Sequence, residues 1–284
     1  MADSPFAFFD LHVLRAARIS PGFVRVTLGG AALSDFACGG RDQRCKVFLP
    51  RPGQARAAVP REAPAAEWWP AWRRMPAGER APMRTYTVRE HRPEAGEAGE
   101  LDIDFALHAD TGPASRWATR ARPGDPLTLL GPVTADNAGV DFRPPEGTDW
   151  HLLAADATAL PAVAGILAWL PPGARARVWI EVEHAADRQE LPTAADAEVT
   201  WLFRDLLPPA ARRDALPAAL RAARLPEGTP YAWLAGEAGT VRELRRHLTG
   251  ERGLDRRRIT FTGYWRRGTS EEDLIAEAIA AEAA

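Results

Sequence analysis

Residues 84–87, RTYT, combine the side-chain types that a flat, phosphate-bearing cofactor needs. In an alternating strand, Tyr86 points to one face while Thr85 and Thr87 point to the other. The Tyr86 ring can stack on an isoalloxazine, and the Thr87 hydroxyl can hydrogen-bond the ring nitrogens. Arg84 can pair with a diphosphate through charge-assisted hydrogen bonds. These residue types favour a flavin site, and a surface strand with ordinary side chains is the alternative.

A second group of candidate residues follows about 20 residues downstream, a distance within one small domain. There the alternating run LDIDFALH leads into ADTGPASRWA. Gly112 and Pro113 end the strand, and Ala114 and Ser115 lie where a short helix begins. Backbone N–H groups at such a turn suit a diphosphate. Either group alone is a weak signal, because short matches occur often by chance.

Four segments together resemble the siderophore-interacting family of FAD-dependent ferric reductases. The segments are RTYTVR, the run H-x-x-x-GPASRWA at 108–118, DATALPAV at 156–163, and WLAGEAGTVRELRRHL followed by GYWRRG at 263–268. They follow the family's order along nearly the whole chain. The resemblance therefore implies a two-domain flavin-reductase-like fold and FAD as cofactor.

The resemblance also implies which residues lie at the FAD. They are Arg84, Thr85, Tyr86, Thr87, His108, Gly112, Pro113, Ala114, Ser115, Asp156, Thr158 and Trp265. Alternatives exist for some of them: His108 can simply end a strand, Thr158 can cap a helix, and Trp265 can be core packing. The family often has Gly-Asp-Glu-Thr where this chain has Ala-Asp-Ala-Thr at 155–158, which puts the fine geometry of that contact in doubt.

Two cations are candidates for binding the substrate, an iron chelate. Lys46 is the only lysine in the chain, and the family also has a lysine in this segment. A compact ammonium attracts an anionic chelate without a fixed bidentate geometry. Arg266 follows Trp265 and would add a second cation, or it would belong to a solvated turn. Val133 stands where many relatives have a basic residue.

The reaction that the resemblance implies passes electrons from NADPH or NADH through FAD to a ferric siderophore, and iron(II) is released. No catalytic acid or base is expected, and the scattered histidines predict no protein-bound metal. Glu183 can hold a ribose diol, whereas Arg188 and Arg204 can meet a 2′-phosphate, so both nicotinamides stay open. Two other functions also stay open: a flavin reductase that feeds another redox protein, and a siderophore-binding protein without activity.

The elements that must position these residues change character along the chain. Before about residue 132, apolar residues alternate in short runs broken by Gly and Pro: FVRVTL, KVFLP, RTYTVR, LDIDFAL and PLTLL. This pattern predicts an antiparallel β-barrel, which we expect to be an FAD-binding domain over 1–135. The Trp-rich stretch 51–82 reads as a long excursion between two barrel strands.

The remainder alternates strand-like and helix-like segments, which predicts an α/β domain with a parallel sheet. We expect it to bind NAD(P)H over 149–284, although no G-x-G-x-x-G loop follows its first strand. The last segment, TSEEDLIAEAIAAEAA, has a capping-box spacing at Thr269 and predicts a terminal helix.

Composition excludes several other classes of function. The 36 basic and 38 acidic residues and the pI near 6.3 give no field for nucleic acid or a membrane surface. The cysteines, Cys38 and Cys45, are too few for an iron–sulfur cluster. With no signal-peptide pattern and no bilayer-spanning apolar run, we expect a cytoplasmic protein, and the architecture needs no partner chain, so we expect a monomer.

Overall fold

The computed structural model describes residues 4–63, 67–107 and 112–282. The chain forms two compact units. Unit 1 contains Met1–Asp141 with Ala164–Trp169, and unit 2 contains Phe142–Val163 with Leu170–Ala284.

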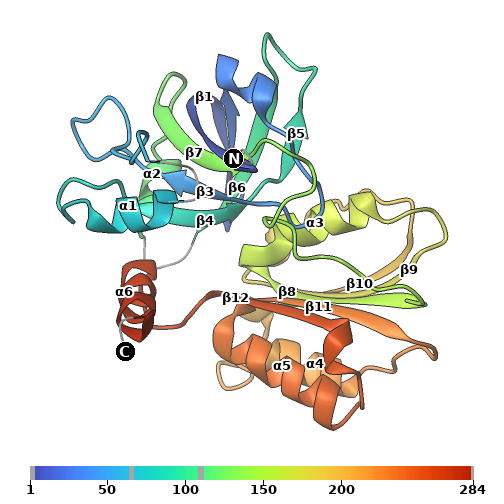
Figure 1. Ribbon diagram of the computed structural model, residues 1–284. Helices are drawn as coiled ribbons and strands as arrows, with labels where there is room; N and C mark the ends of the chain where they lie inside the picture. Colours follow the sequence, from blue (N-terminus) through green and yellow to red (C-terminus); the bar gives the residue numbers. More distant parts are fainter. Residues whose placement is uncertain (1–3, 64–66, 108–111, 283–284) are drawn as a thin grey trace. The chain divides into compact units, whose positions relative to one another are not determined.

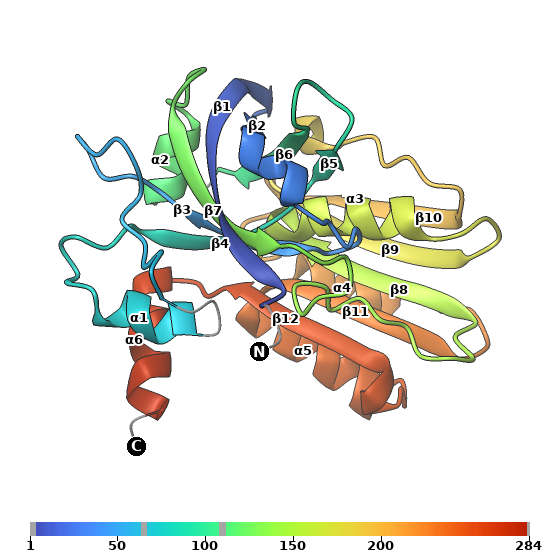
Figure 2. The same ribbon diagram turned by 45° about the horizontal axis from the view of Figure 1, so that its top comes forward.

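Unit 1 is built on a seven-stranded sheet in the order β4-β3-β7-β1-β2-β6-β5, in which every neighbouring pair is antiparallel. The sheet curls on itself, as Figure 2 shows, so the expected antiparallel barrel is confirmed. Its strands are β1 (Phe6–Ser20), β2 (Phe23–Gly29), β3 (Arg44–Phe48), β4 (Met83–Thr87), β5 (Glu90–Arg92), β6 (Glu100–Ala106) and β7 (Pro126–Pro132).

Strand β1 is the longest element of unit 1, and its pairing with both β2 and β7 makes it the centre of the sheet. The period-two analysis did not predict it, because FAFFDLHVL mixes apolar residues on both faces. Its buried side chains, Phe9, Leu11 and Val13, point into the barrel core. Register shifts after Val13 and Arg18 interrupt the regular alternation along its second half.

The two ends of the curled sheet approach each other through aromatic packing. The ring centroid of Tyr86 on β4 lies 4.4 Å from that of Phe105 on β6. Phe105 in turn contacts Trp117 of helix α2 (Pro113–Ala118), with centroids 5.7 Å apart. Apolar packing therefore joins β4 to the inner face of β6.

The excursion between β3 and β4 contains a short helix, α1 (Trp68–Arg74), which carries three tryptophans. Trp69 stacks on the buried Trp72, and the Trp72 Nε1–H donates to the carbonyl of Ala81 over 3.3 Å. Trp68 meets the Phe48 ring edge-on at 6.2 Å. The tryptophans thus anchor the excursion to the end of β3.

Unit 2 contains a five-stranded parallel sheet in the order β10-β9-β8-β11-β12. Helices α4 and α5 cover one face, and α3 begins on the other (Figure 1). The elements are β8 (Trp150–Asp156), α3 (Leu160–Trp169), β9 (Arg175–Val182), β10 (Asp196–Phe203), α4 (Ala215–Ala222), β11 (Pro230–Glu237), α5 (Ala238–Gly250), β12 (Ile259–Trp265) and α6 (Glu271–Glu282). The expected parallel α/β domain with a terminal helix is confirmed.

The order of this sheet creates a switch point between β8 and β11. From β8 the chain runs outward through β9 and β10, and it then returns to add β11 and β12 on the other side. In open α/β sheets, ligands bind outside the carboxyl ends of the strands at such a point. The last residues of β8 and β11 therefore become the candidates for a nucleotide site.

The terminal helix α6 begins one residue later than the sequence predicts. The Asp273 N–H donates to Ser270 Oγ, and the Ser270 N–H donates to Asp273 Oδ2, each over 3.1 Å. The expected cap at Thr269 is wrong, because its hydroxyl instead accepts a hydrogen bond from Arg266 Nε over 3.1 Å. The capping box is formed by the next pair along the chain.

A charged network covers the outer face of β6, whose other face belongs to the core. Arg25 forms a bidentate pair with the buried Asp104, at 2.6 and 2.8 Å. Arg92 donates to both oxygens of the buried Asp102 over 2.9 Å and to Glu100 over 3.1 Å. The hydrogen bond from Arg15, with that from Arg92, lowers the pKa of Glu100 to about 2.

Replacing Arg92 by Gln is expected to lower the free energy of unfolding by about 1–3 kcal/mol at pH 7, because Asp102 stays buried without its cation. Glu100 has a folded pKa below its usual 4.5, so its contribution is complete above that value. The difference between R92Q and the parent should therefore shrink as the pH falls from about 4.5 towards 2.

Urea unfolding at pH 7 and at pH 3 measures this difference. Arg18→Gln is the charge-matched control, because Arg18 donates to the carbonyls of Ser20 and Pro21 rather than to carboxylates. A loss in R92Q that is the same at both pH values contradicts the assignment.

Candidate functional site

Tyr86 is a half-buried aromatic residue near the end of the edge strand β4. Its ring is tilted by 46° against Phe105, which supports it from the core side. Edge position and half-burial match what a ring that stacks on a flat cofactor requires. The two rings hold this part of β4 in place.

Thr85 and Thr87 lie on the same face of β4 but differ in environment. Thr85 is exposed, and its Oγ1 accepts a hydrogen bond from Lys46 Nζ over 2.7 Å. Lys46 is the residue of β3 directly opposite Thr85 in the register. Thr87 is buried, and its Oγ1 has no hydrogen-bond partner within the described part of the chain. A buried hydroxyl without a partner costs free energy, which a bound polar group can recover.

Arg84 is half-buried, and its Nη1 donates to the carbonyl of Met83 over 2.7 Å. The turn at 112–115 leads into α2 with Gly112 at the N-cap and Pro113 in the first turn. Ala114 and Ser115 are buried, and Ser115 Oγ donates to the carbonyl of Ala106 over 3.4 Å, which ties α2 to the end of β6. The first N–H groups of a helix have no partner inside it.

These features of unit 1 fit a flavin. The half-buried ring, the buried hydroxyl without a partner and the helix start supply groups for a flat heterocycle and a diphosphate. The roles predicted for residues 84–87 and 112–115 stay predictions. His108 lies outside the described residues.

Asp156, the last residue of β8, accepts four hydrogen bonds through its carboxylate. Its Oδ1 accepts from the backbone N–H of Thr158 over 2.9 Å and from the Thr158 hydroxyl over 2.5 Å. Its Oδ2 accepts from the Glu237 N–H and from Trp265 Nε1, both over 2.8 Å. One carboxylate thus joins the ends of β8, β11 and β12.

Gly236 makes this contact possible. Its φ of 142° lies in a region that residues with a side chain rarely adopt. A Cβ atom there would lie 2.5 Å from Asp156 Oδ2. The glycine at the end of β11 therefore leaves room for the Asp156 carboxylate of β8 to accept from the Glu237 N–H of β11.

Trp265 and Arg266 lie on the other side of the switch point, at the end of β12. The half-buried Trp265 is oriented by its hydrogen bond to Asp156. Arg266 Nη2 lies 2.5 Å from Glu277 Oε1 of α6. The guanidinium expected to meet the substrate is thus engaged with a carboxylate, and its role stays a prediction.

A second charged group lies at the ends of β9 and β10. Burial raises the pKa of Glu181 to about 7, against the opposing effect of Arg204. Arg204 Nε lies 3.6 Å from Glu181 Oε1 and 3.7 Å from Glu183 Oε2. Glu183 is 46% exposed and Arg188 is exposed, so groups for a ribose diol and for a 2′-phosphate are both present.

The sequence offered the AGEAGT turn at 235–240 as one possible loop for the nicotinamide cofactor but assigned no separate role to Gly236 or Glu237, and it did not indicate Glu181. Glu237 also accepts a hydrogen bond from the Thr240 N–H over 2.9 Å, at the start of α5. The sequence signal that could have pointed to Glu237 is that two apolar strand segments each end on an acidic residue, Asp156 in β8 and Glu237 in β11. Within the described residues no cluster of His, Cys, Asp and Glu could hold a metal ion, and no helix there has the length and apolarity to cross a membrane.

Two family models match the chain. Residues 12–136 match the siderophore-interacting FAD-binding domain, and residues 148–268 match the siderophore-interacting protein model. Together they cover most of the sequence and correspond to its strand-rich half and its α/β half.

Characterised relatives and solved structures are similar along nearly their whole length. The ferric vibriobactin reductase ViuB of Vibrio cholerae is 31% identical over 92% of this chain and 90% of its own. The NADPH-dependent ferric-chelate reductase of Escherichia coli is 31% identical over 91% and 92%. The siderophore-interacting protein SipS from Aeromonas hydrophila superposes with a TM-score of 0.76, at 31% identity, over 99% of this chain and 100% of its own.

A more distant structure shows the fold alone. The FAD/NAD-binding domain of the Vibrio cholerae nitric oxide dioxygenase has a TM-score of 0.57 at 15% identity, over 90% of this chain and 98% of its own. The flavin-reductase-like fold expected from the sequence is thereby confirmed.

Replacing Asp156 by Asn is expected to lower the free energy of unfolding by about 1–3 kcal/mol, because one amide oxygen cannot accept from donors on both sides of the switch point. Amide exchange at Glu237 should accelerate, since its N–H loses the acceptor at 2.8 Å. Urea unfolding and hydrogen exchange measure the two effects.

Asp149→Asn is the matched control, because Asp149 lies just before the other end of β8 and accepts from the Thr229 N–H over 2.5 Å. Its effect should be limited to that end of the strand. Unchanged exchange at Glu237 in D156N is incompatible with the bridging role of the carboxylate.

Proposed function

Because the chain belongs to the siderophore-interacting protein family, we propose that it is a reductase that uses FAD to pass electrons from NAD(P)H to a ferric siderophore. Relatives named as ferric vibriobactin reductase and ferric-chelate reductase, each matched over at least 90% of its length, support this function. The product is iron(II), which hard siderophore oxygens hold less tightly than iron(III).

The observation that carries the proposal in this chain is the pair Tyr86 and Thr87 on β4. Tyr86 offers a half-buried ring backed by Phe105, and Thr87 offers a buried hydroxyl with no partner in the described structure. If a flavin ring stacks on Tyr86, the polar edge of the flavin lies near Thr87. We assign the flavin to the domain spanning 1–135, with Arg84 and the turn at 112–115 at its diphosphate.

When bound, FAD supplies the conversion of a two-electron hydride transfer into single-electron steps. Each NAD(P)H gives up two electrons and leaves as NAD(P)⁺ with release of one proton, and two ferric ions each take one electron. The balance requires no acid or base from the protein. The task of the chain is to bind and orient the partners.

We assign NAD(P)H to the domain spanning 149–284, at the carboxyl ends of β8 and β11. Asp156 fixes Thr158 and Trp265 through its hydrogen bonds and is thus a positioning residue. The charged group around Arg204 lies at the end of β9 and β10, where a dinucleotide's adenosine half binds in sheets of this order. The choice between NADPH and NADH stays open at this group.

For the ferric siderophore we propose Lys46 as the cation that attracts the chelate. Its ammonium lies 2.7 Å from Thr85 Oγ1, one residue before Tyr86. An anionic chelate drawn to Lys46 therefore approaches the strand that carries the proposed flavin ring. The proposal includes a cytoplasmic location and a monomeric state, which stay predictions.

A visible spectrum tests the reaction directly. The purified protein, loaded with FAD, should bleach under anaerobic NADPH or NADH and recover its colour when a ferric siderophore is added, while iron(II) appears. Lys46→Gln should raise the KM for an anionic chelate several-fold and leave bleaching unchanged, whereas Lys46→Arg should retain most of the affinity.

Other outcomes of this experiment favour the alternatives. Flavin that bleaches but is reoxidised only by another redox protein points to a flavin reductase with a protein partner. A protein that takes up no FAD but binds the ferric siderophore is a binding protein, and the proposed function is then wrong.

Thr87→Val tests the flavin contact itself. The substitution removes a hydroxyl that has no partner in the described structure, so the flavin-free protein should keep its stability while FAD affinity falls about 5- to 10-fold. Thr27→Val is the matched control, since its buried hydroxyl donates to Asp102 over 2.6 Å. It should lower stability and leave FAD affinity unchanged, and the reverse pattern would falsify the contact.

A further inference from the structure

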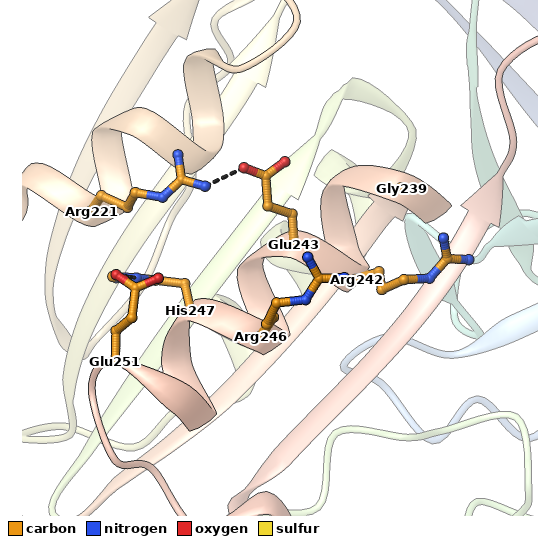
Figure 3. A pocket seen from close by; sticks show the side chains of 7 residues that line it. All are labelled: Arg221, Gly239, Arg242, Glu243, Arg246, His247 and Glu251. Atoms are coloured by element: carbon orange, nitrogen blue, oxygen red, sulfur yellow. Dashed lines mark hydrogen bonds and ion pairs between the residues drawn. The ribbon is translucent and has the colours of Figure 1, made fainter.

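The outer side of α5 carries two adjoining hollows of about 320 and 330 Å³. Arg242 and Arg246 line both of them, from consecutive turns of the helix. Figure 3 shows the first hollow, in which Glu243 is turned toward Arg221 of α4. Gly239 lies two residues after the end of β11, close to the proposed NAD(P)H site, but no other lining residue belongs to the proposed flavin and nicotinamide sites.

Cations dominate this surface. The second hollow is lined by Arg242, Arg245, Arg246 and Arg256 together with Thr249, and by no acidic residue. Among the described residues, the side chains of these four arginines form no ion pair and no hydrogen bond, and Arg245 and Arg246 accept from the Thr249 hydroxyl only through their backbone carbonyls. Four uncompensated positive charges thus lie together in a chain whose formal net charge is −2.

Two acidic side chains line the first hollow together with the arginines. Glu243 of the first hollow forms an ion pair with Arg221. Glu251 Oε2 lies 2.9 Å from Nδ1 of the buried His247. Neither carboxylate is paired with Arg242 or Arg246, and the second hollow is lined by no carboxylate, so the positive charge there is available for an external anion.

Arg245 is held in a fixed orientation. Its guanidinium lies 4.3 Å from the centroid of the Phe261 ring on the edge strand β12. Its Nε is buried and has no acceptor among the described residues. A guanidinium fixed by an aromatic face loses less conformational entropy when it binds an anion, and an anion can compensate a donor that is left without an acceptor.

We propose that this side of α5 binds a ligand with two linked phosphate groups, one in each hollow, with Arg242 and Arg246 between them. The planar fork of arginine matches phosphate oxygens bidentately, which favours phosphate over other anions. The two hollows have the size of small-ligand sites, and their shared wall of cations suits two linked anions. The ligand is a free diphosphate or the phosphorylated headgroup of a membrane lipid.

Titration calorimetry with pyrophosphate and inorganic phosphate at low ionic strength tests the site on the full-length protein. Pyrophosphate should bind at least tenfold more tightly than phosphate, and R242S/R246S should weaken pyrophosphate binding by at least tenfold. R213S/R224S is the charge-matched control, because both residues are exposed and line neither hollow; its affinity should equal that of the parent.

Vesicle co-sedimentation distinguishes the two sources of the ligand. Binding to vesicles that contain cardiolipin, whose headgroup has two phosphates joined through glycerol, but not to phosphatidylcholine alone, with the same loss in R242S/R246S, supports a lipid headgroup. Tight pyrophosphate binding without vesicle binding supports a free diphosphate.

Pyrophosphate affinity that is the same in R242S/R246S as in the parent, or an equal loss in R213S/R224S, overturns the proposal. The absence of binding to both probes also overturns it. NAD(P)H-dependent ferric reduction should be unchanged in R242S/R246S, which shows that the variant is folded and that the site is separate from the proposed reaction.

Discussion

The carboxylate of Asp156 is the interaction on which the functional end of unit 2 depends. It accepts four hydrogen bonds, from Thr158 twice, from Glu237 and from Trp265. Parallel strands are held together along their length by their ladders, but at a switch point the connections that follow neighbouring strands lead to opposite sides of the sheet. A single carboxylate shared by three strand ends fixes the geometry of the edge at which we propose that the dinucleotide binds.

In unit 1 the candidate site lies on an edge strand, β4, which has a neighbouring strand on one side only and must be held in place by other contacts. The core contact between Tyr86 and Phe105 fixes β4 from the inside, and pairing with β3 fixes it from the side. Buried hydroxyls in this unit divide into two kinds. Thr27 is satisfied by Asp102 and serves the fold, whereas Thr87 is not satisfied by any described residue and is free to serve a ligand.

Much of this architecture could be predicted from the sequence, because alternation and strand–helix rhythm depend on local spacing. The segments around Tyr86 and Asp156 were recognisable for the same reason, since their residue types occur in short, ordered runs. The contacts of Asp156 were not, because its partners at 237 and 265 are brought near only by the order of the sheet. The cap at Ser270 was missed because Thr269 offers an equally good local pattern, and strand β1 was missed because its apolar residues do not alternate.

Lys46 has a consequence beyond substrate attraction, because it is the only side-chain amine in the sequence. Acylating reagents modify amines and leave guanidinium groups intact, so the 35 arginines among the 36 basic residues stay unmodified. A fluorophore attached by such chemistry reports from one side-chain position, on β3 and beside Thr85. Apart from the α-amino group, the composition of this protein thus provides one attachment point for an optical probe, at the strand pair next to the proposed flavin.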